Sequence, residues 1–341
     1  MRVELLAEQG GVVVDGVVQH YGDPEAELKA AEAGLVMVAP PRPGMLELQG
    51  DDAQRFCNSM LTNNFRDLAP GARVHTAITD SKARVEALLD GWMVAPGNFL
   101  LVFEDTDMEW AHDRLDMYII MDPIELIARH EEWGLLHLRG AGASEALQAL
   151  GLPEISSLTS LEDGGFAGPN DRYGAPGVDL MVPFAALVSL FSRLKDAGVA
   201  PVGFLAAEAL RIRAGLPRHP QDIGKRAFPH ELGLRDRICS FTKGCYMGQE
   251  IINRMDTMGK LTRRLVLVEL EQPAEPGVEL QVEGKGVGEL TSVSSLGGRH
   301  LGLGILRKAA WEAGSALDVI PEGSARSLGP VRSGPDAPPE G

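Results

Sequence analysis

Residues 243–250 read K-G-C-Y-M-G-Q-E and lead into a run of helical spacing that ends near Gly259. The two glycines give a flexible turn, which predicts that Cys245 lies at a helix N-terminus, two residues after Lys243. Main-chain amides at a helix N-terminus and a nearby cation both favour the thiolate form of a cysteine. The pattern therefore indicates a reactive thiol supported by Lys243. A small buried cysteine with a structural role has equal weight on chemistry alone.

Before this stretch, strand-like and helix-like runs alternate over residues 1–261. Several strands follow one another directly, and the tight Pro96-Gly97-Asn98 segment predicts a hairpin. Interleaved helices and strands with such hairpins favour an α+β region rather than a doubly wound parallel sheet.

After the stretch, short strand-like runs are separated by Gly and Pro: 264–270, 279–282, 288–293, 301–306 and 316–319. This spacing predicts a small antiparallel barrel or sandwich over residues 262–320. The end of the chain, residues 321–341, is rich in Pro, Gly and Ser and poor in apolar residues, which predicts a disordered tail.

The charge of the chain excludes one class of function. The 341 residues carry a net charge of −16, which argues against a nucleic-acid-binding protein because neutralising phosphates requires clustered Lys and Arg. Residues 208–264 differ, with twelve Lys and Arg against six Asp and Glu, a local excess of +6. This segment suits an anionic small molecule or an acidic partner, whereas a solvated mixed surface is the simpler interpretation.

Membrane and metal sites are not expected either. No stretch approaches the roughly 20 consecutive apolar residues of a membrane span, and Glu4 and Glu8 interrupt the place of a signal core. The three cysteines, Cys57, Cys239 and Cys245, are too few for a disulfide framework or a four-thiolate cluster. We therefore expect a cytoplasmic protein with no permanently bound metal or cluster.

The 243–250 stretch, with Arg254 and the Arg263-Arg264-Leu265 run, resembles the signature of YgfZ-type proteins. These are folate-binding members of the glycine-cleavage T-protein (aminomethyltransferase-like) superfamily. Other segments resemble the family more loosely, and the similarity covers residues 40–320: Leu61-Thr62-Asn63-Asn64, Arg211-Ile212-Arg213-Ala214-Gly215, Pro229-His230-Glu231 and the strands from Pro276 to Val319. The resemblance implies a cloverleaf of two ferredoxin-like α+β subdomains and a small C-terminal antiparallel β-barrel, with tetrahydrofolate in a central channel.

The resemblance also implies a role in assembling or repairing iron–sulfur clusters. Cys245 would act as a redox thiol or transient ligand, supported by Lys243, while Gly244 and Gly248 shape the loop. The candidate cofactor-binding residues are Asn63, Arg211, Tyr246, Gly248, Gln249 and Arg254. The expected partners are a polyglutamylated reduced folate, whose anionic tail would meet residues 208–264, and iron–sulfur client or assembly proteins. Neither nucleic acid nor a membrane is an expected partner.

Three positions depart from the T-protein pattern. The aspartate that helps aminomethyl transfer in T-proteins falls at or beside Ala87, where the nearest acids are Glu86 and Asp90. The glutamate that grips the pterin corresponds to Arg213, and the aspartate of the L-T-N-D segment is Asn64. These departures argue against the glycine-cleavage reaction.

The prediction is therefore a tetrahydrofolate-binding accessory protein, with enzyme activity left open. One alternative is a folate-dependent aminomethyl or methyl transferase in which Asp80 or Asp90 replaces the missing acid. Another is a scaffold that has kept the fold and lost the ligand.

Overall fold

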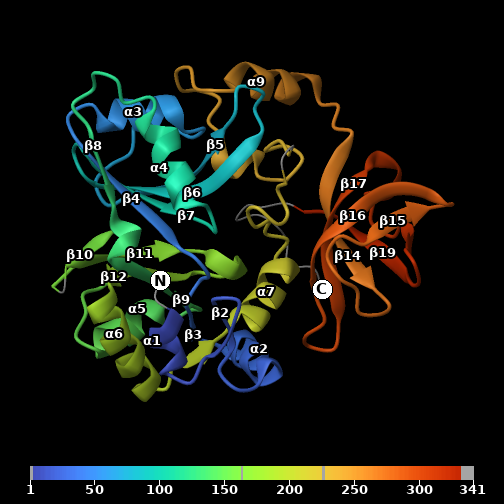
Figure 1. The fold of residues 1–341 in the computed structure, drawn as a ribbon, viewed down its shortest axis with the longest axis horizontal. Helices are drawn as coiled ribbons and strands as arrows, with labels where there is room; N and C mark the ends of the chain where they lie inside the picture. Colours follow the sequence, from blue (N-terminus) through green and yellow to red (C-terminus); the bar gives the residue numbers. More distant parts are fainter. Residues whose placement is uncertain (1–2, 163, 225–226, 332–341) are drawn as a thin grey trace. The chain divides into compact units, whose positions relative to one another are not determined.

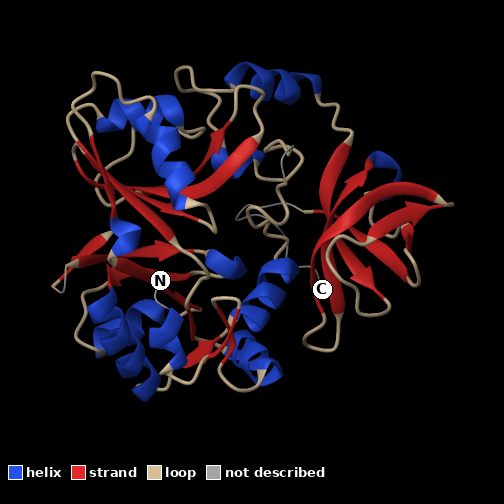
Figure 2. Cartoon of the chain, in the orientation of Figure 1, coloured by secondary structure: helices blue, strands red, loops and turns tan. Residues whose placement is uncertain are grey.

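The computed structural model describes residues 3–162, 164–224 and 227–331, in which helices and strands alternate along the chain (Figures 1 and 2). The chain divides into two compact units. Unit 1 runs to Gln54 and includes Asp67–Arg73 and Asp90–Leu210. Unit 2 includes Arg55–Arg66, Val74–Leu89 and the chain from Arg211 onward. Each unit is therefore assembled from segments that are distant in the sequence.

A six-stranded sheet in unit 1 has the strand order β10-β11-β12-β9-β3-β13. Its strands are β3 (Val36–Val38), β9 (Trp133–Arg139), β10 (Thr159–Leu161), β11 (Gly165–Asn170), β12 (Gly177–Pro183) and β13 (Ala200–Val202). β13 pairs with β3 in parallel, and the other neighbours are antiparallel. Helix α6 (Phe184–Asp196) buries Leu187, Leu190, Phe191 and Leu194, a spacing that places all four on one helix face.

A second sheet has the order β5-β6-β7-β4-β8. Its strands are β4 (Gly44–Gln49), β5 (Arg73–Thr79), β6 (Val85–Ala95), β7 (Asn98–Phe103) and β8 (Glu125–Ala128). In unit 2, β5 lies beside the first half of β6. In unit 1, the second half of β6, from Asp90, continues into β7, β4 and β8. The predicted hairpin joins β6 to β7 through Gly97, whose positive φ of 76° suits glycine.

The C-terminal part of unit 2 is a closed barrel with the order β14-β17-β16-β15-β18-β19. Its strands are β14 (Arg263–Leu270), β15 (Glu279–Val282), β16 (Lys285–Ser294), β17 (His300–Arg307), β18 (Ala316–Val319) and β19 (Ser324–Pro330). β19 pairs with both β14 and β18 and so closes the barrel. The prediction that disorder begins at Pro321 is therefore wrong for Ser324–Pro330, while residues 332–341 of the predicted tail lie outside the described residues.

The remaining described elements complete the chain. They are α1 (Val3–Ala7), β1 (Val12–Val14), β2 (Val17–His20), α2 (Pro24–Ala33), α3 (Ala53–Met60), α4 (Met108–Asp116), η1 (Arg129–Glu131), α5 (Ala143–Ala149), η2 (Arg172–Gly174), α7 (Phe204–Arg213), α8 (Arg235–Ile238), α9 (Gln249–Met258) and η3 (Lys308–Ala310). No helix among the residues that the structure describes has the length and hydropathy of a membrane span.

Candidate functional site

Lys243 points into the interior of unit 2, where its side chain is buried. Its Nζ donates hydrogen bonds to the main-chain oxygens of Asn58 at 2.7 Å, Asn63 at 2.6 Å and Leu61. The same nitrogen lies 4.6 Å from the centre of the Tyr246 ring, a cation–π distance. The lysine thus fastens the 243–250 loop to the end of α3 and to the segment that follows it. Its amine is directed at these carbonyls, and electrostatic support of Cys245 stays a prediction.

Burial controls the protonation of Lys243 and of two nearby thiols. Burial lowers the pKa of Lys243 to about 7. Burial also raises the pKa of Cys57 and of Cys239 to about 12. Both thiols are therefore neutral near pH 7, and neither provides a counter-charge for the lysine.

Cys245 is exposed, whereas Cys57 and Cys239 are buried. Helix α9 begins at Gln249 and has Gly248 as its N-cap. The prediction that Cys245 itself lies at the helix N-terminus is therefore wrong by four residues, because the turn before the helix is longer than the sequence pattern indicates. The position instead presents the thiol on an exposed loop, between the buried side chains of Lys243 and Tyr246.

Gly248 is the glycine that the loop requires. Its φ is +84°, and a Cβ at this position would lie 2.8 Å from Cα of Ala83. Gly248 thus allows the loop to approach the main chain of the protein closely at Ala83. Gly244 differs, because a Cβ there would meet only the Arg66 guanidinium, at 3.5 Å. Thr79 anchors the loop further by donating a hydrogen bond from Oγ1 to the Met247 oxygen at 2.7 Å.

Asn63 lies directly beside the motif loop. Its Nδ2 donates to the His75 oxygen at 2.8 Å and to the Arg237 oxygen at 3.1 Å, and its Oδ1 accepts the Asn64 amide at 2.9 Å. The structure thus brings Asn63, Lys243 and Tyr246 together. The side chain of Asn63 is occupied by contacts within the loop region of unit 2.

Arg211 belongs to a different polar cluster of unit 2. It is buried and donates to Asp222 Oδ2 at 2.6 Å, to Ser292 Oγ at 2.7 Å and to the Leu216 oxygen at 2.5 Å. These partners give the arginine a structural role beside barrel strand β16. Of the other two predicted contacts, Arg254 lies exposed on α9, and Gln249 is the half-buried first residue of that helix.

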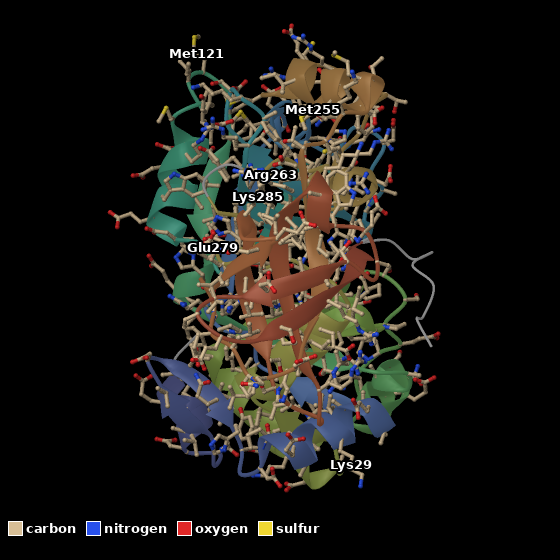
Figure 3. The ribbon with its side chains drawn as sticks, turned by 90° about the vertical axis from the view of Figure 1, so that its right-hand side faces the viewer. Lys29, Met121, Met255, Arg263, Glu279 and Lys285 are labelled. Atoms are coloured by element: carbon tan, nitrogen blue, oxygen red, sulfur yellow. The ribbon has the colours of Figure 1, made fainter. Side chains whose placement is uncertain are left out.

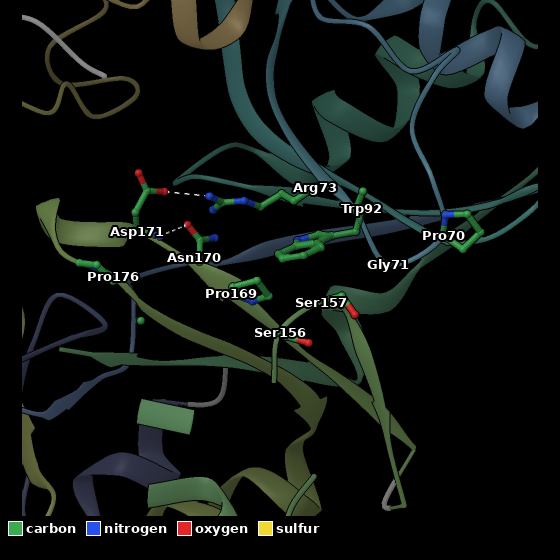
Figure 4. Close-up of a pocket in the computed structure, with 12 residues that line it drawn as sticks. Pro70, Gly71, Arg73, Trp92, Ser156, Ser157, Pro169, Asn170, Asp171 and Pro176 are labelled. Atoms are coloured by element: carbon green, nitrogen blue, oxygen red, sulfur yellow. Dashed lines mark hydrogen bonds and ion pairs between the residues drawn. The ribbon is translucent and has the colours of Figure 1, made fainter. Parts of the chain in front are cut away.

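Unit 1 contains a cavity of about 540 Å³, open to solvent, that was not predicted from the sequence (Figure 4). None of the predicted site residues lines it. The lining consists of small and apolar groups with a few polar side chains: Pro70, Gly71, Ala72, Arg73, Trp92, Ser156, Ser157, Pro169, Asn170, Asp171, Pro176 and Gly177. Such a mixture of apolar walls and few polar groups is typical of small-molecule sites.

Two donors at the cavity lack hydrogen-bond acceptors. The Trp92 side chain is fully buried, and its Nε1 has no acceptor among the described residues. Nη1 of Arg73 is also buried without a hydrogen bond, while Nη2 donates to Asp171 at 2.9 Å. The guanidinium carbon lies 5.7 Å from the centre of the Trp92 ring. Both nitrogens are buried beneath the cavity surface, and Arg73 Nη1 lies 3.9 Å from Asp90 Oδ1 as a long ion pair.

A buried charge cluster supports one wall of this cavity. Asn170 donates from Nδ2 to Asp90 at 2.9 Å and to Asp179 at 2.7 Å. Arg172 binds the same two carboxylates, at 3.2 Å and 2.9 Å, and His137 Nδ1 lies 2.8 Å from Asp179. These contacts fix Asn170 at the cavity. One signal could have revealed the cluster, since Asp90, His137 and Asp179 each interrupt an apolar strand.

The charges in the cluster set the protonation of its members. Burial raises the pKa of Asp179, but the Arg172 guanidinium and the His137 hydrogen bond outweigh burial, so that its pKa lies below the usual value. Burial lowers the pKa of His137. The histidine is therefore neutral near pH 7, and its protonated Nδ1 donates to an ionised Asp179.

The position of the missing T-protein acid lies on β6. Ala87 is fully buried there, so no carboxylate stands at that point. Asp80, one proposed substitute, accepts hydrogen bonds from the main-chain amides of Lys82 and Arg84, both at 2.8 Å. Asp90, the other, is buried in the charge cluster. Both acids have structural partners within their own units.

Known proteins match this chain in two ways, over the C-terminal barrel and over nearly the whole sequence. The family described as CAF17, C-terminal beta-barrel domain, matches residues 262–333. A chloroplastic protein of Arabidopsis thaliana that carries the name of a transferase is 30% identical over 328 residues, which cover 91% of this chain and 74% of the relative. The chain belongs to the YgfZ/CAF17 family of the aminomethyltransferase-like superfamily. The family suggested by the K-G-C-Y-M-G-Q-E stretch is thus confirmed.

Other relatives of this YgfZ/CAF17 protein are named aminomethyltransferases. The protein from Rubrobacter xylanophilus is 28% identical over 300 residues, covering 84% of this chain and 79% of the relative. The protein from Staphylococcus saprophyticus is 24% identical over 294 residues, covering 81% and 80%. The crystal structure of aminomethyltransferase T of the Bartonella henselae glycine cleavage system superposes with a TM-score of 0.87 at 20% identity, covering 96% of each chain. The predicted T-protein-like α+β fold with a C-terminal barrel is therefore confirmed.

Proposed function

We propose that this YgfZ/CAF17 protein binds a reduced folate and supports the assembly or repair of iron–sulfur clusters through Cys245. Three cysteines are present, and Cys245 is the exposed one. It lies on a loop that Lys243 and Gly248 fix to unit 2 through main-chain contacts. A fixed, exposed thiol can attack a partner's disulfide, forming a mixed disulfide and releasing the other sulfur as a thiolate, or it can ligate a cluster transiently. This observation carries the proposal.

The cavity in unit 1 fits the ring system of a folate. A pterin ring is flat and carries polar groups along its edge, which would suit a lining that combines Trp92 and Pro169 with polar side chains such as Ser156 and Ser157. A volume of about 540 Å³ lies in the ordinary range for sites that hold a cofactor of this size. The resemblance nominates residues of unit 2 instead, among them Gln249 and Arg254. The cavity and the family resemblance therefore suggest different folate-binding residues, and substitutions at each set can distinguish the two possibilities.

Calorimetric titration with tetrahydrofolate tests the folate proposal. We expect Ser157→Trp, which places an indole at the cavity lining, to weaken binding at least tenfold, while Arg254→Ala on α9 serves as the matched control. Weaker binding by Arg254→Ala, with unchanged binding by Ser157→Trp, would place the pterin ring at the residues that the resemblance implies. Absence of binding by the unaltered protein would refute the folate proposal.

The polyglutamate form offers a second measurement. Residues 208–264 carry a net charge of +6, and ion pairs with an anionic tail weaken as salt screens them. Polyglutamylated tetrahydrofolate should bind more tightly than the monoglutamate at low ionic strength, with the difference shrinking as salt is added. Equal affinities at low salt would remove the role of this segment.

The cluster role is tested in cells that lack the endogenous protein. Cys245→Ser should abolish support of iron–sulfur enzyme activity, while its folate affinity and melting temperature stay those of the unaltered protein. Full support by this variant would refute the role of the thiol. We further propose a cytoplasmic location, which fits three free cysteines; the Arabidopsis relative is chloroplastic.

The names of the relatives favour one second candidate, a folate-dependent aminomethyl transferase. The buried Ala87 and the structural partners of Asp80 and Asp90 weigh against it. Turnover with the remaining glycine-cleavage components, at an ordinary enzyme rate on the order of 1 per second or more, would establish the transferase.

A further inference from the structure

Helix α4 of unit 1 is followed by an exposed apolar segment, residues 117–121, which we call the apolar tip. It reads M-Y-I-I-M, and the exposed fractions reach 66% for Met117, 82% for Ile120 and 92% for Met121. Figure 3 shows the Met121 side chain at the periphery of the drawn structure, pointing outward. Three such side chains in five residues expose roughly 400 Å² of apolar surface, the size at which patches on monomers are often functional.

The chain geometry maintains this exposure. Main-chain hydrogen bonds from Met117 to Asp113, from Tyr118 to Leu115 and from Ile119 to Asp116 continue the end of α4 as tight turns. Leu115 is the last residue of α4 in the core. The residues beyond it are therefore held out from unit 1 rather than folded back over it.

The sequence around the apolar tip is rich in acidic residues. Residues 104–125 contain eight Asp and Glu and a single basic residue, Arg114, for a net charge of −7 out of −16 for the whole chain. The Arg114 guanidinium lies over the Tyr118 ring at 5.2 Å. Glu104 and Asp105 pair with Arg172 and Arg42, whereas five acids are exposed: Asp107, Glu109, Asp113, Asp116 and Glu125. Asp113, for example, has 77% of its side chain exposed.

We propose that the apolar tip docks a basic amphipathic helix of a partner protein. The apolar stripe of such a helix would cover Met117, Ile120 and Met121, and its flanking Lys and Arg would face the exposed carboxylates within residues 107–125. Methionine suits this task because its flexible, polarisable side chain adapts to different apolar surfaces. Anionic lipid headgroups and a second acidic tip would both be repelled by the same charge. This inference is independent of folate binding.

A synthetic probe tests the proposal on the full-length protein. The probe is a fluorescent 18-residue peptide of Leu and Lys with a helical apolar stripe, and binding is followed by fluorescence anisotropy. We expect saturable binding that weakens at least tenfold in Ile120→Ser/Met121→Ser and again on addition of salt. The matched control is Met258→Ser, a change at another exposed methionine (58%) on α9, which should leave affinity unchanged.

Two further peptides distinguish the contribution of the apolar stripe from that of the positive charge. A scrambled peptide of the same composition lacks the stripe and should bind at least tenfold more weakly, and a Leu/Glu peptide should not bind. Equal affinity for the scrambled peptide, or equal affinity of the double variant, would reduce the interaction to charge alone and overturn the proposal. Circular dichroism and the single variant Met121→Ser establish that any loss is not caused by misfolding.

Other occupants of the tip would also overturn the proposal. Sedimentation equilibrium would detect a dimer that Ile120→Ser/Met121→Ser disrupts, which would assign the tip to a second copy. Flotation with vesicles of three parts phosphatidylcholine to one part phosphatidylglycerol would detect a membrane-binding segment. Failure of the peptide experiment leaves the folate titration unaffected, so the two proposals can fail separately.

Discussion

Replacing Lys243 by methionine should remove a defined part of the pH dependence of stability. The side chain keeps its approximate length but loses the amine that donates to three main-chain oxygens. In the unfolded chain the amine has its ordinary pKa of 10.5, whereas burial lowers the pKa to about 7 in the folded protein. Between these two values the unfolded chain binds more protons than the folded one. Stability conferred by this group therefore rises with pH across the window from 7 to 10.5.

The magnitude follows from the two pKa values. One bound proton changes the free energy of unfolding by about 1.4 kcal/mol per pH unit, so the contribution of Lys243 grows by about 2 kcal/mol between pH 7 and pH 9. Cys57 and Cys239 act in the opposite direction only at higher pH. Burial raises their pKa values to about 12, and their stabilising effect is lost as pH rises above about 9. The interval from pH 7 to 9 therefore isolates the lysine.

Urea denaturation at pH 6, 7, 8 and 9 measures this effect in the unaltered protein and in Lys243→Met. The free energy of unfolding of the unaltered protein minus that of Lys243→Met should increase by about 2 kcal/mol from pH 7 to pH 9. Lys285→Met, at an exposed lysine of the barrel, is the matched control and should show no such change. A difference that stays constant within about 0.5 kcal/mol would mean that the three carbonyl oxygens keep the ammonium charged throughout, which would refute the reasoning.

Three other predictions test the site and its support. Maleimide labelling followed by mass spectrometry should modify Cys245 of the native protein faster than the two buried cysteines, and Cys245→Ser should leave the melting temperature unchanged; preferential labelling of a buried cysteine would contradict this. Arg172→Met should destabilise unit 1 by about 3–5 kcal/mol in urea because Asp179 keeps a buried charge without its arginine, and a loss below 1 kcal/mol would contradict the cluster. Gly248→Ala should cost about 1–2 kcal/mol in the same assay, since φ is +84° there. Gly244→Ala, whose Cβ would make an ordinary contact with the Arg66 guanidinium, should cost little; equal losses would argue against the close approach.

The sequence was sufficient for the class of fold because the relevant signals are local. Short strands with Gly and Pro between them identify the barrel, and the 243–250 motif identifies the family. The last barrel strand was missed because Ser324–Pro330 contains few apolar residues. This strand is held in place by pairing with β14, about 60 residues earlier, and by small buried side chains such as that of Ser327. Composition measured along the chain does not register such long-range pairing.

The site was predicted less completely for a similar reason. Lys243 stands two residues before Cys245, and sequence proximity indicated that its charge would serve the thiol. The oxygens that it contacts lie 180 to 185 residues earlier in the chain. The cavity likewise gathers residues from three separate parts of unit 1, with Trp92 between the segments 70–73 and 156–177. A side chain's partners depend on the fold, so spacing alone could not assign them.

The geometry also separates two kinds of residue within the K-G-C-Y-M-G-Q-E motif. Lys243, Tyr246 and Gly248 face the protein's own chain, and their contacts position the loop. Cys245 is exposed between them, so a change there removes a thiol and little packing. Loss of activity in a variant at one of the first three positions would therefore follow from a displaced loop as readily as from lost chemistry. Cys245 is the position in the described loop at which activity and stability can be measured as independent quantities, and the chemical hypothesis depends on that comparison.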